Sequence, residues 1–279
     1  MSSFRTILAA TDFTRRSRAV TGRAAALARQ HGARLVLVHA IERRARTVKR
    51  LRLRKLPDPM ARAETEMKKL RDSLPDLEVQ VEIAADSPHL LVQRIADSHD
   101  VGLIVLGLHL ARRVLDSVRL TTLERIVQSA SCPVLIAHDP AIAPYRKVLG
   151  AITFAPASAQ ALRVAAALAP GAEFHAIHAL QLTLGAKLPA ADMMKSAEMT
   201  QAQMLRKAFL QFEGLPDGLA LPEIVPGGVH EVLQFRINEL QPDLVVIGSH
   251  SGRDPTRLGA YARDLMRAPP TDMLVAKPG

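Results

Sequence analysis

Residues 147–169, KVLGAITFAPASAQALRVAAALA, repeat the pattern of residues 6–28, TILAATDFTRRSRAVTGRAAALA. Each stretch holds a short apolar run, then a phenylalanine, then an alanine-rich segment. The two copies lie 141 residues apart, and the same offset relates residues 103–110, LIVLGLHL, to residues 244–251, LVVIGSHS. A constant offset over most of each half indicates two copies of one domain.

The junction between the copies lies in residues 138–147, HDPAIAPYRK, where Pro140 and Pro144 interrupt any regular element. A chain of 279 residues is also long enough for two domains of ordinary size. We therefore assign the first domain to residues 1–141 and the second to residues 142–279.

Apolar runs of strand length alternate with segments of helical pattern in the first copy, and the second copy keeps the same order. Strands are expected at residues 5–10, 34–40, 77–83, 101–107 and 133–137, and helices at 15–32, 58–74, 87–99 and 121–130. Gly32 is expected to end the first helix, and Ser87 to cap the third. This order predicts a doubly wound α/β fold, with a five-stranded parallel sheet and helices on both faces in each domain.

The positive charge of the chain is concentrated in its first half. Residues 1–141 hold 24 Lys and Arg against 15 Asp and Glu, a net of +9, whereas residues 142–279 hold 13 against 12, a net of +1. The single cysteine, Cys132, cannot form an internal disulfide, which fits a reducing compartment. The sequence has no long apolar segment, so we expect neither a signal peptide nor a membrane span.

The repeated motifs together resemble a tandem universal stress protein. The matching residues are ILAATDFTRRSRAV (7–20), GLHL (107–110), GSHS (248–251), TTLERIVQSASCPVLIA (121–137) and its counterpart YARDLMRAPPTDMLVA (261–276). The resemblance implies a flavodoxin-like fold and a cytoplasmic protein associated with stress survival. It also implies pairing through the last strand of each domain, and it divides the family into members that bind ATP and members that do not.

Nucleotide-binding members of this family carry G-x-x-G, nine residues, then G-[ST], and an Asp at the end of the first strand. Glycine lets the backbone approach the phosphates closely with its N–H groups free. In the first copy Asp12, Gly107 and Thr121 match this pattern, but Leu110 and Leu120 stand where two glycines belong. The first copy therefore keeps the acid and the hydroxyl and loses two of the three glycines.

The second copy is incomplete in a different way. Thr153 replaces the Asp, Gly248 and Gly259 match glycines, Ser251 holds the other glycine position, and Ala260 lacks the hydroxyl. We interpret both loops as vestigial nucleotide loops and expect no bound cofactor, with ATP as the less favoured alternative. Their candidate residues are Asp12, Gly107, His109, Thr121, Gly248, Ser249, His250 and Gly259.

Catalytic and metal-binding chemistry find little support in the sequence. His175 and His178 are three apart on a predicted strand, so they face opposite sides and cannot chelate one ion. No Cys/His group has zinc spacing, and no G-x-S-x-G motif is present. Ser17 and Ser158 lie in the first turn of a helix, where capping explains them. We therefore expect neither a metal site nor an enzyme.

The stretch Arg43–Lys55, RRARTVKRLRLRK, holds eight basic residues and no acid. Two interpretations remain open. It is either a basic arm for an anionic partner or a solvated connection between two elements. No aromatic residue interleaves it, so it offers no base stacking to a nucleic acid.

Three functional hypotheses follow. The leading one is a non-enzymatic cytoplasmic stress-response protein that acts as a binding or regulatory module. The first alternative is an ATP-binding switch with at most slow turnover. The second is an anion-binding adaptor that acts through residues 43–55.

The two domains are expected to pair within the chain as a pseudo-dimer. Residues 133–137, PVLIA, and 272–276, DMLVA, are apolar, end their domains, and would otherwise leave open sheet edges. Whether chains assemble further into a homodimer is not determined by the sequence.

Overall fold

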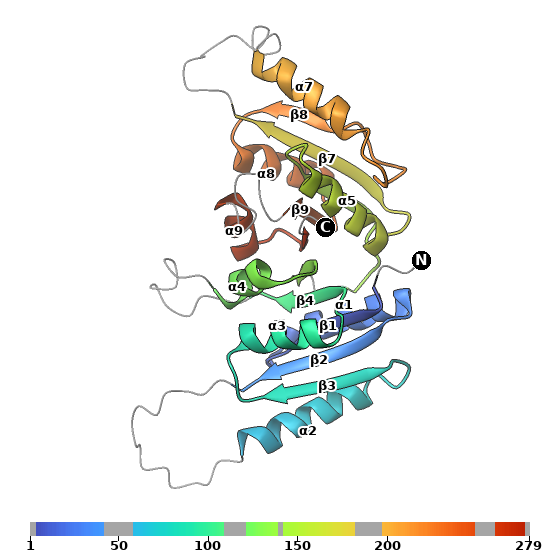
Figure 1. Ribbon diagram of the computed structural model, residues 1–279, viewed down its shortest axis with the longest axis vertical. Coiled ribbons are helices and arrows are strands. Elements are labelled where there is room, and N and C mark those ends of the chain that lie inside the picture. Colours follow the sequence, from blue (N-terminus) through green and yellow to red (C-terminus); the bar gives the residue numbers. More distant parts are fainter. Residues whose placement is uncertain are drawn as a thin grey trace, which may run out of the picture. The chain divides into compact units, whose positions relative to one another are not determined.

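The computed structural model describes residues 4–41, 58–108, 121–138, 142–181, 197–248 and 260–276 (Figure 1). The chain divides into two compact units, Met1–Ile142 and Ala143–Gly279. Each unit is a doubly wound α/β domain, which confirms the predicted fold class.

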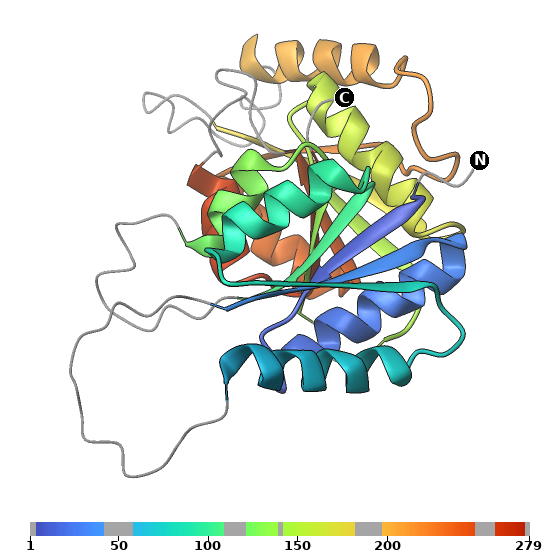
Figure 2. The same cartoon turned by 60° about the horizontal axis from the view of Figure 1, so that its bottom comes forward.

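The first unit has five parallel strands in the order β3-β2-β1-β4-β5. Figure 2 shows helices α1 and α2 (blue and cyan) on one face of this sheet and helices α3 and α4 (green) on the other. The elements are β1 (Thr6–Ala10), α1 (Ser17–His31), β2 (Arg34–Ala40), α2 (Pro59–Asp72), β3 (Val79–Ala84), α3 (Pro88–Ser98), β4 (Leu103–Gly107), α4 (Thr122–Ser129) and β5 (Val134–Ala137).

The second unit repeats this topology, with parallel strands in the order β10-β9-β6-β7-β8. Its central strands, like those of the first unit, are continuous apolar runs that are buried on both faces. The elements are β6 (Lys147–Ala151), α5 (Pro156–Leu168), β7 (Glu173–Leu180), α7 (Ala197–Phe209), β8 (Glu223–Pro226), α8 (Val229–Leu240), β9 (Leu244–Gly248), α9 (Ala260–Arg267) and β10 (Asp272–Ala276).

The predicted helix ends differ in accuracy. Gly32 ends α1 in the left-handed conformation, with φ of 61°, as predicted. Ser87 stands at the N-cap position of α3, but its side chain makes no capping hydrogen bond, so that part of the prediction is wrong. The Ser87 N–H donates instead to Asp86 Oδ1, at 2.7 Å, and the Ser87 hydroxyl is buried without a hydrogen-bond partner.

The carboxyl group of Asp76 is expected to titrate well below the ordinary range. Arg29 Nε and Nη2 donate to its two oxygens at 2.5 and 2.9 Å, and this hydrogen bonding lowers the pKa of Asp76 from 3.8 to about 2. A lowered folded-state pKa stabilises the fold above pH 3.8, and the contribution is lost as the pH falls toward 2. Carboxyl chemical shifts followed by NMR during acid titration will measure this. Arg29→Gln should return the midpoint to the ordinary range, and an unchanged midpoint would contradict the pairing.

Candidate functional site

The turn between β1 and α1 is held by buried hydroxyl groups. Thr11 Oγ1 donates to Ser17 Oγ at 3.0 Å, and Ser17 Oγ donates to the Thr14 carbonyl oxygen at 2.9 Å. The N–H of Phe13, whose φ is 60°, donates to Thr11 Oγ1 at 3.1 Å. The sequence-based prediction that Ser17 caps α1 is therefore wrong, because no side-chain capping hydrogen bond is made at the start of this helix. Ser17 ties the strand end to the first helical turn, because the left-handed Phe13 brings Thr11 and Ser17 together.

The second unit builds the same turn with a different donor. Thr153 N donates to Ser158 Oγ at 3.0 Å, and Phe154 again has φ of 60°. Ser158 is buried, and no side-chain capping bond is made at the start of α5. The prediction of a helix cap is thus corrected for Ser158 as well. Its hydroxyl accepts from the strand-end loop and not from the helix N-terminus.

Two histidines at equivalent strand ends close these turns from the neighbouring strand. His39 Nδ1 lies 2.8 Å from the Thr11 carbonyl oxygen, and His178 Nδ1 lies 2.9 Å from that of Ile152. Because a carbonyl oxygen only accepts, Nδ1 carries the proton in both rings. Each imidazole also packs on the left-handed phenylalanine, with centroids 4.2 Å apart for Phe13 and 4.7 Å for Phe154. This repeated contact is structural, and His175 takes no part in it.

Asp12, the candidate nucleoside-binding acid, has partners within its own turn. Its Oδ1 accepts from the Thr14 N–H at 3.0 Å and from Thr14 Oγ1 at 2.6 Å. Partial burial opposes ionisation of Asp12, but the Thr14 hydrogen bonds outweigh it, and the pKa of Asp12 is lowered. Asp12 is therefore an ionised, exposed carboxylate at the carboxyl edge of the sheet.

Gly107 and Gly248 end the equivalent strands β4 and β9, and each lies against the first helix of its unit. A Cβ on Gly107 would lie 2.8 Å from Val20 Cγ2 of α1, and one on Gly248 would lie 3.4 Å from backbone atoms of Ala157 in α5. Gly107 lets the first helix of its unit approach the strand end closely. Packing against α1 therefore accounts for the glycine at 107, whereas a Cβ at 248 would make an ordinary contact with α5.

Thr121, the candidate phosphate-binding hydroxyl, caps helix α4. Its Oγ1 accepts from the Glu124 N–H at 3.1 Å, and its own N–H donates to Glu124 Oε2 at 2.6 Å. This reciprocal pair is a capping box, and Glu124 is fully buried. The T-x-x-E spacing was a readable signal for it in the sequence. Both polar groups of Thr121 thus have a role in the fold.

Replacing Thr121 tests this role. Thr121→Ala removes the acceptor of the Glu124 N–H and should lower the free energy of unfolding by about 1 kcal/mol. Thr121→Ser keeps the hydroxyl and should retain most of the stability, as measured by urea denaturation. An alanine variant as stable as the parent would show that the capping box contributes nothing.

The structure brings some of the candidate residues together. Asp12 follows β1 and Gly107 ends β4. Because these strands are parallel neighbours, the two residues lie at the same edge of the sheet. Thr153 and Gly248 have the same relation through β6 and β9. Four candidates lie outside the described residues: His109, Ser249, His250 and Gly259. The basic segment 43–55 also lies outside them.

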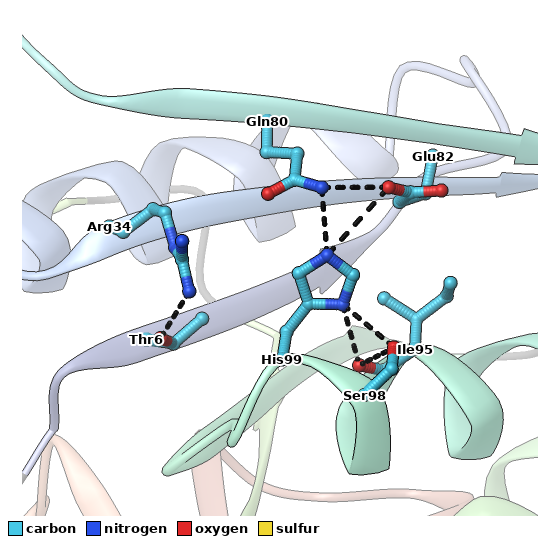
Figure 3. Close-up of polar contacts among 7 residues, drawn as sticks. All are labelled: Thr6, Arg34, Gln80, Glu82, Ile95, Ser98 and His99. Carbon is cyan, nitrogen blue, oxygen red and sulfur yellow. Dashed lines mark hydrogen bonds and ion pairs between the residues drawn. The ribbon is translucent and has the colours of Figure 1, made fainter.

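A polar cluster between β3 and α3 was not anticipated from the sequence (Figure 3). His99 Nδ1 lies 2.9 Å from Ser98 Oγ and 3.1 Å from the Ile95 carbonyl oxygen, and its Nε2 lies 2.7 Å from Gln80 Nε2. Gln80 also donates to Glu82 Oε1 at 2.9 Å. The cluster joins the edge strand of the first unit to the end of its third helix, and its members are already partnered by one another.

The described residues offer neither a metal site nor a membrane span. Among the described residues, no group of three or more His, Cys, Asp or Glu side chains is placed to hold a metal ion. Cys132, the single cysteine, is buried. Within the described ranges, no helix is both long and apolar enough to cross a membrane.

The comparisons with known proteins agree with this architecture. The model of the universal stress protein family matches residues 3–138 and again residues 144–277. The chain belongs to the universal stress protein family, as a tandem member with two family domains. The predicted resemblance is thereby confirmed. No curated protein matched the sequence.

Solved structures resemble the whole chain. A universal stress protein from Archaeoglobus fulgidus DSM 4304 is 19% identical, with a TM-score of 0.69 over 100% of this chain and 97% of that one. A putative universal stress protein from Pseudomonas aeruginosa UCBPP-PA14 is 18% identical, with a TM-score of 0.65 over 99% and 94% of the two chains. A functionally unknown protein from Pseudomonas aeruginosa PAO1 is 19% identical, with a TM-score of 0.67 over 99% and 94%. These likenesses concern the fold.

Proposed function

We propose that this universal stress protein is a non-enzymatic cytoplasmic binding or regulatory module in which the described residues that match the nucleotide-binding pattern serve the fold. The capping box of Thr121 carries the proposal. The one hydroxyl that matches the nucleotide-binding pattern accepts from the helix N-terminus, and a fully buried carboxylate takes the Thr121 N–H. The cap of α4 therefore accounts for Thr121 without a bound phosphate.

The other described matches support the same interpretation. Gly107 and Gly248 lie against α1 and α5, and at Gly107 a Cβ would meet the Val20 side chain at 2.8 Å. Asp12 is hydrogen-bonded within its own turn, and Thr153 offers no carboxylate at the equivalent place. Hydroxyl and histidine contacts hold each turn internally, so neither turn needs a ligand to be held in place.

An ATP-binding switch is the second candidate. Asp12 favours it, because its carboxylate is ionised and exposed at the sheet edge beside Gly107. Incubation of the full chain with magnesium and ATP separates the two functions. We expect no release of ADP above the buffer rate and no nucleotide in the native mass spectrum of the purified protein. Turnover that Asp12→Asn abolishes would instead establish the switch.

The anion-binding adaptor remains the third proposal, and it rests on the eight basic residues of Arg43–Lys55. A partner held by these residues should be released by salt, since screening weakens contacts between exposed charges. Retention on heparin that is lost between about 0.05 and 0.2 M salt would favour the anion-binding adaptor. A variant with these basic residues replaced by glutamine should not be retained. The same retention in both proteins would exclude this segment as its cause.

A further inference from the structure

A cavity of about 360 Å³ lies between α8 and the strands β7 and β8 of the second unit. Its apolar lining residues include Ile177, Val225 and Pro226. Phe235 of α8 lines the wall and is 65% exposed. A volume in this range suits a small molecule, and an exposed phenylalanine beside it leaves apolar surface that a ligand can cover.

The repeat places different residues at the equivalent positions of the first unit. At the constant offset of 141 residues, Phe235 corresponds to Arg94 and Gly227 to Asp86. In the first unit Arg94 Nη1 lies 3.3 Å from Asp86 Oδ2, so an ion pair links the third helix to the end of the edge strand. The second unit has a phenylalanine and a glycine instead, and the ion pair is replaced by an apolar recess.

Two charged residues, Glu231 and Arg236, line the recess. The guanidinium group of Arg236 pairs with both Glu223 and Glu239, so its charge is already balanced. Glu231, which corresponds to Leu90 of the first unit, adds an exposed carboxylate to the lining. Two carboxylates pair with the guanidinium, and Glu231 adds a third carboxylate to the lining, although the chain as a whole carries a net charge of +10.

We infer that this recess binds a small organic cation with an apolar body, of the alkylammonium or arylalkylammonium class. The apolar body would cover Ile177, Val225 and the exposed ring of Phe235. The cationic head would lie beside the Glu231 carboxylate, where the aromatic face adds a cation–π attraction. An anion of the same shape would meet the Glu231 carboxylate, while the Arg236 guanidinium is already paired with Glu223 and Glu239. The site is specific to the second unit, because each of its distinguishing residues differs at the equivalent position of the first.

Three probes of one shape test the inference on the full chain: 4-phenylbutylamine, 4-phenylbutanol and 4-phenylbutyrate, which are cationic, neutral and anionic. Titrations followed by NMR should give the amine a dissociation constant roughly five-fold lower than that of the alcohol, with the carboxylate weakest. Saturable binding of the amine in the millimolar range or tighter is the expected result. Binding of the carboxylate as tightly as the amine, or no saturation by any probe, would overturn the inference.

Exposed positions provide the variants, and circular dichroism will check that each one folds. Glu231→Gln should remove the difference between the amine and the alcohol, and Phe235→Ala should weaken both. Arg94→Ala changes the equivalent exposed position of the first unit. It should alter neither the binding of the amine nor that of the alcohol, which makes it the matched control. Binding that is insensitive to Phe235→Ala, or that is lost equally in Arg94→Ala, would place the probe elsewhere and refute the site.

Discussion

ATP, titrated with magnesium into the purified protein, should bind with a dissociation constant no tighter than roughly 0.1 mM, or about 5.5 kcal/mol of binding free energy. In the first copy Leu110 and Leu120 put branched side chains where the family's nucleotide binders have glycine, and close backbone approach to phosphate needs glycine. In the second copy Ala260 has no hydroxyl, and Thr153 has no carboxylate for the nucleoside. Isothermal titration calorimetry will measure this affinity.

A gain-of-function variant makes the expectation sharper. Leu110→Gly combined with Leu120→Gly restores the glycines of the family pattern beside Asp12 and Thr121, and should bind ATP at least ten-fold more tightly than the parent. The strongest reason to expect otherwise is the basic composition of both loops, since guanidinium groups hold anions without glycine. These residues are Arg112, Arg113, Arg119, Arg253 and Arg257. Micromolar binding by the unmodified protein would refute the expectation, and Asp12→Asn or Gly248→Ala would then identify the copy responsible.

Phe154→Ala should destabilise the second unit by about 3–5 kcal/mol, the usual cost of removing a buried phenylalanine. Phe154 is 5% exposed and packs on both His178 and Phe209, with centroids 4.7 and 5.6 Å apart. Phe13 is only partly buried and stacks on His39, so Phe13→Ala should cost about 1–2 kcal/mol. Urea denaturation of the two variants will compare the equivalent positions, and equal losses would contradict the difference in packing.

Glycine at these two positions should reverse the usual order of stability. A variant with alanine is normally more stable than one with glycine. At a φ of 60° the backbone is in the left-handed region, which is unfavourable for any residue with a Cβ. Phe154→Gly and Phe13→Gly should therefore be about 1 kcal/mol more stable than the matching alanine variants. An alanine variant that is the more stable of its pair would mean that the backbone leaves the left-handed conformation once the ring is removed.

Much of the fold could be predicted from local pattern. The strand predicted at residues 34–40 has the bounds of β2, and Gly32 ends α1, because apolar runs and a left-handed terminal glycine act within a few residues. The site was less predictable. The sequence does not tell a glycine needed beside a phosphate from one needed beside a helix, and only the contact of Gly107 with Val20 of α1 reveals the helix.

The sequence by itself determined the tandem repeat, the doubly wound fold and the family, since these depend on periodicity and spacing along the chain. Only the tertiary structure decided what the matching residues do. Ser17 acts through Thr11, six residues away and brought near by a left-handed Phe13. The recess beside Phe235 likewise requires β7, β8 and α8 to meet, because its lining side chains come from all three elements. The spacing of residues along one strand or helix does not show how close they lie to residues of another.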